Sequence, residues 1–322
     1  MATRKSGKKQ QPKSLAKSVQ EVSSLVPRGT EKTMVDLMRI LNEQNFETVA
    51  EANDFMKKLM ASGGQIPNPL PVSALEQAQD IMYRAFESRN PTERVHLAQE
   101  ALNLSRDCAD AYILLAEENT PTLQAQKTLF EAGVKAGERA LGPQKFEEFK
   151  GHFWGVLETR PYMRARCGLA GCLRALGEND LAIEHLNALL QLNPNDNQGI
   201  RYLLVPLLFD VGDDEALENL FIAYEEEYSA TWKYTNALLV FKRTGNSPEA
   251  NLMLQDALAY NPFVPAYLLG KKRIPKTLPP YMGVGDNNEA IHYSVDARQN
   301  WHKTKGALEW LKAALATNTK TD

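Results

Sequence analysis

The chain has 322 residues, of which 43% are hydrophobic and 24% charged, and its formal net charge is −3. This composition is typical of a folded globular protein and excludes a low-complexity chain. The longest apolar run, residues 202–209, is far shorter than the roughly 20 residues of a membrane-spanning helix. No secretory hydrophobic region lies near the N-terminus, so we expect a cytoplasmic protein without a membrane segment.

The first 20 residues hold six lysines and arginines and no acid, so they carry +6 and the rest of the chain carries −9. They contain few large apolar residues, and we expect residues 1–29 to be a disordered basic tail. Such a tail either keeps the protein soluble or touches nucleic acid. We favour solubility, because the remaining chain is acidic, and we do not expect a nucleic-acid partner.

The next segment, residues 30–63, has the pattern of two short helices. Met34, Leu37, Met38 and Leu41 recur at helical spacing in the first helix. Residues 64–72 begin with Gly64, directly after Gly63, and contain three prolines, which predicts a linker without helix.

An internal repeat begins after the linker. Residues 163–196 and 231–264 align at one offset of 68 residues, which is twice the 34-residue period of tetratricopeptide repeats. Leu169 matches Ala237, and Ala182 matches Ala250. Small residues at the helix contact let two helices of a hairpin approach, and neighbouring hairpins must stack because one hairpin cannot bury its apolar face. The sequence therefore predicts an all-α solenoid of tetratricopeptide-like antiparallel hairpins.

The copy between these two segments has a one-residue deletion, and upstream lie a copy with a three-residue deletion and a weaker first copy at 75–108. We expect four to five hairpins in an array over residues 73–264, with an insertion at 140–162 where Gly142 and Pro143 break a helix. Pro206 lies inside a repeat helix, and we expect it to bend that helix and tune the curvature of the array.

The C-terminal part, residues 265–316, begins with a proline-rich irregular stretch. Two helices near 286–298 and 301–316 follow it. We expect these helices to cap the array, because a terminal repeat must cover its exposed apolar face. Residues 317–322 are expected to be a disordered tail.

Sequence motifs for catalysis, metal binding and cofactor binding are absent. The chain has no phosphate loop, dinucleotide glycine pattern, zinc helix or nucleophile elbow, and its five histidines are scattered. Cys108, Cys167 and Cys172 have no disulfide or metal spacing and are expected to be buried thiols. We therefore expect no enzyme, no cofactor and no metal, although an unrecognised enzyme with its site at residues 151–166 stays an alternative.

The insertion is the most unusual segment. Residues 151–166 concentrate aromatic and arginine side chains, among them Trp154 and Arg160, and such residues are typical of binding hot spots. The alternative is that Phe153 and Trp154 fill the core where the repeat register breaks. The two interpretations are equally supported by the sequence.

A partner is expected on the concave face of the array. Tetratricopeptide grooves are lined by fixed positions of each first helix, and those positions hold aromatic and cationic residues here. Trp232 and Tyr202 offer flat apolar area, and three cations offer charge-assisted donors. With the insertion, the predicted partner-binding residues are Trp154, Arg160, Arg164, Arg174, Tyr202, Trp232 and Lys242.

Several blocks of the chain resemble one family. Residues 108–118 (CADAYILLAEE), 261–270 (NPFVPAYLLG) and 285–293 (GDNNEAIHY) look like blocks of the suppressor of tumorigenicity seven family. Trp301 followed by GALEWL at 306–311 resembles its C-terminal block. The resemblance covers residues 105–315 and is nearest to the short, soluble, bacterial-type members. It implies the repeat fold, supplies no reaction, and does not bring the membrane segments of animal members to this chain.

These observations together predict a non-catalytic scaffold or adaptor that binds a peptide or protein partner. The sequence does not identify the partner, the pathway or the oligomeric state.

Overall fold

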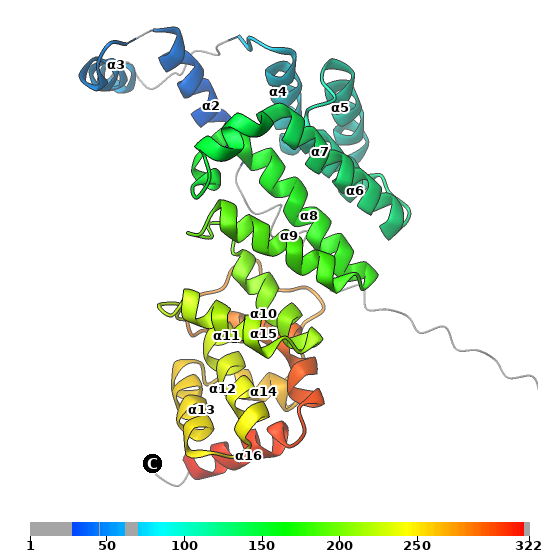
Figure 1. The fold of residues 1–322 in the computed structure, drawn as a ribbon, viewed down its shortest axis with the longest axis vertical. Coiled ribbons are helices and arrows are strands. Elements are labelled where there is room, and N and C mark those ends of the chain that lie inside the picture. Colours follow the sequence, from blue (N-terminus) through cyan, green and yellow to red (C-terminus); the bar gives the residue numbers. More distant parts are fainter. Residues whose placement is uncertain (1–27, 45, 62–69, 319–322) are drawn as a thin grey trace, which may run out of the picture. The chain divides into compact units, whose positions relative to one another are not determined.

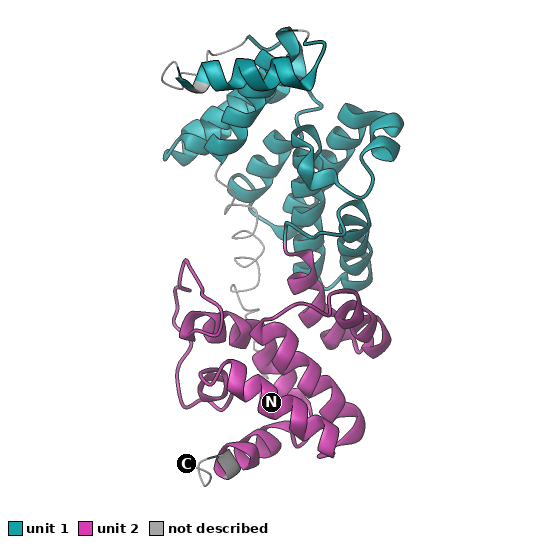
Figure 2. Cartoon of the chain, turned by 90° about the vertical axis from the view of Figure 1, so that its left-hand side faces the viewer, with its two compact units in different colours: residues 1–198 teal, residues 199–322 magenta. Residues whose placement is uncertain are grey.

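The computed structural model describes residues 28–44, 46–61 and 70–318, and every regular element in these ranges is a helix (Figure 1). The predicted all-α class is confirmed. The predicted basic tail falls almost entirely outside the described residues, as do most of the linker and the last four residues. The chain divides into two compact units, residues 1–198 and 199–322, each described by itself (Figure 2).

Unit 1 contains two N-terminal helices followed by three helical hairpins. The N-terminal helices are α2 (Arg28–Glu43) and α3 (Val49–Ala61). The hairpins are α4 (Ala74–Glu87) with α5 (Pro91–Leu104), α6 (Ala109–Glu118) with α7 (Leu123–Glu148), and α8 (Arg160–Leu176) with α9 (Asn179–Leu192). The first helices α4, α6 and α8 contact one another in sequence order, and α2 packs on α4.

Unit 2 contains two hairpins and three further helices. The hairpins are α10 (Ile200–Val211) with α11 (Asp214–Ala223), and α12 (Ala230–Thr244) with α13 (Pro248–Tyr260). The short helix α14 (Val264–Leu268) leads to α15 (Asn287–Lys303) and α16 (Ala307–Asn318). Helix α15 packs on the first helices α10 and α12, and α16 packs on α12 and α13. The five hairpins agree with the predicted α-solenoid.

The repeat register is the one that the 68-residue offset predicts. Leu169 and Ala237 are both buried on first helices, and Ala182 and Ala250 are both completely buried on second helices. Close approach inside unit 1 also depends on Gly168 of α8, where a Cβ atom would lie 2.3 Å from the ring of Phe130. Any larger residue there must displace the Phe130 ring, which packs α7 against α8.

The insertion contains the helix break that the sequence predicts. Gly142 adopts φ 65° and ψ 165° inside α7, a conformation that favours glycine. Two turns of 3₁₀ helix, Phe153–Gly155 and Leu157–Thr159, then lead into α8. Phe153 is completely buried, and its ring lies 5.2 Å from Phe146 and 6.3 Å from Tyr162. Phe153 therefore fills the core at the register break.

The C-terminal helices differ from the predicted ones in their boundary. Trp301 was expected at the start of the last helix, but it lies inside α15, which ends at Lys303. The Thr304 amide still bonds to the Asn300 carbonyl at 3.0 Å, and Gly306 with φ 81° makes the turn into α16. Helix α10 runs from Ile200 to Val211 with Pro206 inside it.

Candidate functional site

The seven predicted binding residues fall in both units. Trp154, Arg160, Arg164 and Arg174 belong to unit 1, and Tyr202, Trp232 and Lys242 belong to unit 2. The expectation that these side chains are exposed together is wrong for two of them, Arg164 and Trp232. Each unit is therefore considered separately.

Arg164 is buried on α8, with 2% of its side chain exposed. Its Nε and Nη2 atoms donate to Asp110 at 2.9 and 2.6 Å, and its Nη1 and Nη2 atoms donate to Glu31 at 3.0 and 3.1 Å. Both carboxylates are buried too. The chain itself uses four of the five guanidinium N–H donors, and the side chain does not face solvent as predicted.

Three further side chains complete this arrangement. The Tyr83 hydroxyl donates to Glu31 at 3.1 Å, the Gln79 amide donates to Asp110 at 2.8 Å, and Arg160 reaches Glu31 at 3.4 Å. We call Glu31, Tyr83, Asp110, Arg160 and Arg164 the Glu31 cluster. Burial alone raises the pKa of Asp110, but Arg164 and Arg28 overcome this and hold the pKa below its ordinary value.

The remaining predicted residues of unit 1 are half-buried. The Arg160 guanidinium lies 5.2 Å from the ring of Trp154, and its Nε donates to the Trp154 carbonyl at 2.9 Å. Glu158 pairs with Lys145. These contacts fold the insertion onto itself. Arg174 lies in the last turn of α8.

Trp232 is core rather than groove, because only 5% of it is exposed. Its ring packs edge-on against Tyr202 at 5.8 Å and Phe221 at 5.2 Å. The Tyr202 hydroxyl donates to Glu227, which also accepts from Arg201 at 2.6 Å. Burial and the hydrogen bond to Glu227 raise the pKa of Tyr202 to about 12. The aromatic rings that were predicted to contact a partner thus pack against one another inside unit 2.

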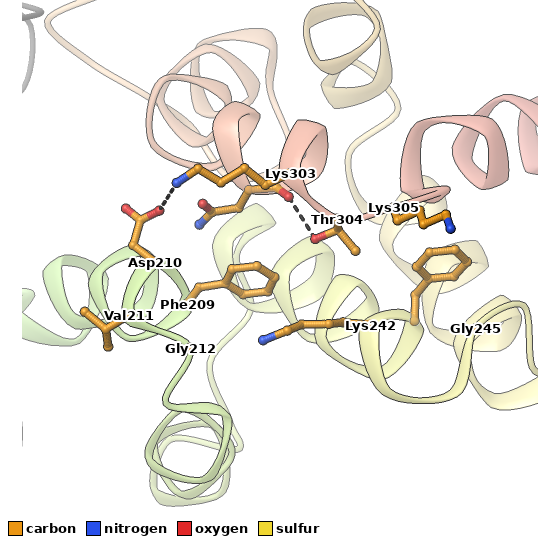
Figure 3. Close-up of a pocket in the computed structure, with 11 residues that line it drawn as sticks. Phe209, Asp210, Val211, Gly212, Lys242, Gly245, Lys303, Thr304 and Lys305 are labelled. Carbon is orange, nitrogen blue, oxygen red and sulfur yellow. Dashed lines mark hydrogen bonds and ion pairs between the residues drawn. The ribbon is translucent and has the colours of Figure 1, made fainter.

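Lys242 is exposed as predicted and lines a pocket of about 540 Å³ between α10, α12 and the end of α15 (Figure 3). Its Nζ lies 5.3 Å from the Phe209 ring and pairs with Asp214 at 2.6 Å. Figure 3 shows Lys303 on the other side of that ring, directed at Asp210. The Nζ to carboxylate distance there is 3.4 Å.

The pocket also has residues that no sequence pattern indicates. Lys303, Lys305 and Asn300 come from α15 and the turn after it. Asn300 is 3% exposed, and its backbone carbonyl accepts the hydrogen bonds from Thr304. Phe241 forms an apolar wall, stacked on Trp310 at 4.3 Å. Cations, two rings and a buried amide thus meet in one pocket.

Reactive groups are few in the described part of the chain. No three His, Cys, Asp or Glu side chains group there as metal ligands. The three cysteines are buried, as predicted, and burial raises the pKa of Cys108 and Cys167 to about 12 and of Cys172 to about 11. Across residues 28–44, 46–61 and 70–318, no helix combines the length and hydropathy needed to span a bilayer.

Comparison with known proteins supports the resemblance noted in the sequence. A family model described as "ST7 protein" matches residues 72–320. Curated relatives include "Suppressor of tumorigenicity 7 protein-like" of Bos taurus, 30% identical, and that of Gallus gallus, 29% identical. Each match covers 74% of this chain and 47% of the relative.

"Protein ST7 homolog" of Drosophila melanogaster is 28% identical over 74% of this chain and 48% of its own length. The chain thus spans about half the length of the curated relatives that it matches. No solved structure matches it. The family model covers well over half of the sequence, and the chain belongs to the ST7 protein family.

Proposed function

We propose that the protein is a non-catalytic scaffold, and that the pocket of unit 2 binds an acidic segment of a protein partner. The observation that carries the proposal is the meeting of Lys242, Lys303 and Lys305 with two phenylalanine rings and the buried amide of Asn300. Carboxylates are the groups that lysines attract, and the rings supply apolar area beside them.

The ion pairs already present in the pocket are weak enough for a partner carboxylate to replace them. Lys242 and Lys303 pair with Asp214 and Asp210 at the surface, and exposed pairs contribute only about 0–1 kcal/mol each. A partner carboxylate can replace either aspartate at little cost. Lys305 is exposed and has no ion pair within the described residues. The Asn300 amide can donate to a carboxylate or accept from a peptide N–H.

The test uses the full chain and a fluorescent peptide of eight glutamates, with a peptide of eight glutamines as its neutral match. We expect the glutamate peptide to bind more tightly and its affinity to fall with added salt. Replacing Lys303→Glu and Lys305→Glu should weaken that binding roughly tenfold or more, since each reversal removes about 1 kcal/mol or more. The control variant, Lys276→Glu with Lys312→Glu, has the same charge change at exposed positions away from the pocket.

Fluorescence anisotropy measures both affinities. The proposal fails if the Lys303→Glu, Lys305→Glu variant binds the glutamate peptide as tightly as the control variant does. It fails equally if the glutamine peptide binds as well as the glutamate peptide. Capture from a cell lysate, compared between the same two variants, then identifies the natural partner.

No specific observation in the described residues favours either of the other two functions, nucleic-acid binding or catalysis. Binding of nucleic acid was assigned to residues 1–20, which lie outside the described residues. A catalytic site at 151–166 was the second alternative, and in that segment Phe153 fills the core while Glu158 and Arg160 make the contacts given above.

A further inference from the structure

Helix α2 is attached to unit 1 in an unusual way. Of its 16 residues, only Glu31 and Ile40 are buried. Its apolar face is only partly covered, since Met34 is 43% and Met38 56% exposed while Leu37 and Leu41 are half-buried. An amphipathic helix normally docks by its whole apolar face, so a further contact contributes to holding α2 in place.

That contact is the carboxylate of Glu31. It accepts hydrogen bonds from two Arg164 nitrogens at 3.0 and 3.1 Å and from the Tyr83 hydroxyl at 3.1 Å. The paired geometry of an arginine and a carboxylate is directional and selective. Glu31 is 1% exposed, so these bonds form away from water.

The hydrogen bonds that orient the receptor for Glu31 come from helices other than α2. Arg164 is held by Asp110 of α6 through two hydrogen bonds, and Asp110 is held by Gln79 of α4. Three first helices therefore orient one guanidinium toward the place where Glu31 lies. A site ordered in advance loses little entropy when a ligand arrives, which favours binding of any matching carboxylate.

Polar contacts also join α2 to α4 elsewhere. Arg39 bonds to Asp80 at 2.9 Å and lies 3.0 Å from Glu76, both on α4. The Arg28 guanidinium lies 3.1 Å from the centre of the Phe86 ring. Desolvation offsets much of the attraction in such pairs, so they select a geometry more than they add stability. The interface thus selects for a helix that presents a carboxylate at the position of Glu31.

We propose that the surface formed by Tyr83, Arg160 and Arg164 is a docking site for a partner helix carrying a glutamate, and that α2 is its built-in occupant. A partner helix that presents its glutamate to Arg164 displaces α2. This site lies in unit 1 and is independent of the lysine pocket of unit 2. An occupant on the same chain competes at a high effective concentration, so the site is closed until α2 is released.

The test releases α2 in the full chain by Glu31→Lys, which places a cation against Arg164. The matched control is Glu43→Lys, the same change at an exposed position of the same helix. Hydrogen exchange with mass spectrometry should show at least tenfold faster exchange of α2 in Glu31→Lys, while α8 and α15 keep their protection. The control should exchange as the wild type does.

Binding is then measured with a fluorescent peptide of residues 28–44 as the probe. We expect at least tenfold tighter binding to Glu31→Lys than to the wild type, since the site is then open. The same peptide carrying Glu31→Gln should lose at least tenfold in affinity. Equal binding of the two peptides, equal binding to the two proteins, or unchanged exchange of α2 overturns the proposal.

Two further measurements keep the test decisive. If Glu31→Lys unfolds unit 1, Tyr83→Phe replaces it, because this change removes only the hydroxyl that donates to Glu31. Faster exchange of α2 in Tyr83→Phe supports the proposal, and unchanged exchange contradicts it. Sedimentation tests a second copy as occupant: a wild-type dimer that Glu31→Lys dissociates would overturn the assignment to a foreign partner.

Discussion

Helices α2 and α15 lie on the first helices of their own units, and they are held there by different forces. Helix α2 buries two of its 16 residues, whereas α15 buries eight of 17, including the completely buried Trp301. The Trp301 indole N–H donates to Tyr293 at 2.8 Å, and its ring lies 6.4 Å from Tyr234. Helix α15 is thus part of the core of unit 2, while α2 is an attachment to unit 1.

Each helix also buries a glutamate, and the two carboxylates have different partners. Glu31 is bound by arginines, as described above. Glu289 accepts from the backbone amides of Ala230 and Gly285 at 2.9 and 2.8 Å and from the Asn261 amide at 2.9 Å. Neutral backbone donors belong to the fold and bind no outside ligand without unfolding. A guanidinium that is already fixed by Asp110 can change its second carboxylate.

The largest expected effect comes from removing the anchor of α15. Replacing Trp301→Ala leaves a large cavity and removes the donor to Tyr293, which should cost about 3–5 kcal/mol of folding free energy. Urea unfolding, followed by hydrogen exchange of α12 and α15, measures the loss. A cost below about 1 kcal/mol would show that α15 is held no more firmly than α2, which would contradict the difference drawn between the two helices.

Acid should increase the difference in stability between α2 and α15. The pKa of Asp110 is lowered in the folded state, so its charge stabilises unit 1 above its unfolded pKa, and this contribution is lost as pH falls through the folded pKa. Between pH 7 and 5 we expect no change. Below the ordinary value of 3.8, α2 should lose protection before α15 does.

Hydrogen exchange, corrected for the intrinsic rate at each pH, follows both helices. Asp110→Asn should remove this acid step by removing the titrating group, and Asp180→Asn, at an exposed position of α9, should retain it. Simultaneous loss of α2 and α15 in the wild type would show that the Glu31 cluster has no special sensitivity to acid.

The fold was predictable because its signal is local and repeated. Ala182 and Ala250 occupy matching buried positions, and the 68-residue offset alone identifies them. Helix breaks at Gly142 and before Arg160 follow from the conformations that glycine and proline favour. The boundary between α15 and α16 was wrong, because Trp301 and its apolar neighbours fit the stripe of either helix.

The site was less predictable, since it depends on contacts between distant segments. Arg164 was assigned to a groove by its repeat position, but Glu31, 133 residues away, occupies that position. Lys303 and Asn300 were missed because nothing in the repeat pattern places α15 on α10 and α12. Trp232 shows that clustered aromatics indicate a core as readily as a binding surface.

The smallest expected effect concerns the outer stripe of α2. Met34→Gln with Met38→Gln keeps the helix propensity and removes apolar area that is already about half exposed. Such surface changes usually stay within about 0.5 kcal/mol, so α2 should exchange within about threefold of the wild type. The matched change on α15, Ile291→Gln, places an amide at a side chain that is 5% exposed and should speed exchange of α15 much more. If the two methionine changes release α2, then apolar contacts hold it, the Glu31 carboxylate is secondary, and the contrast between the two helices is one of degree.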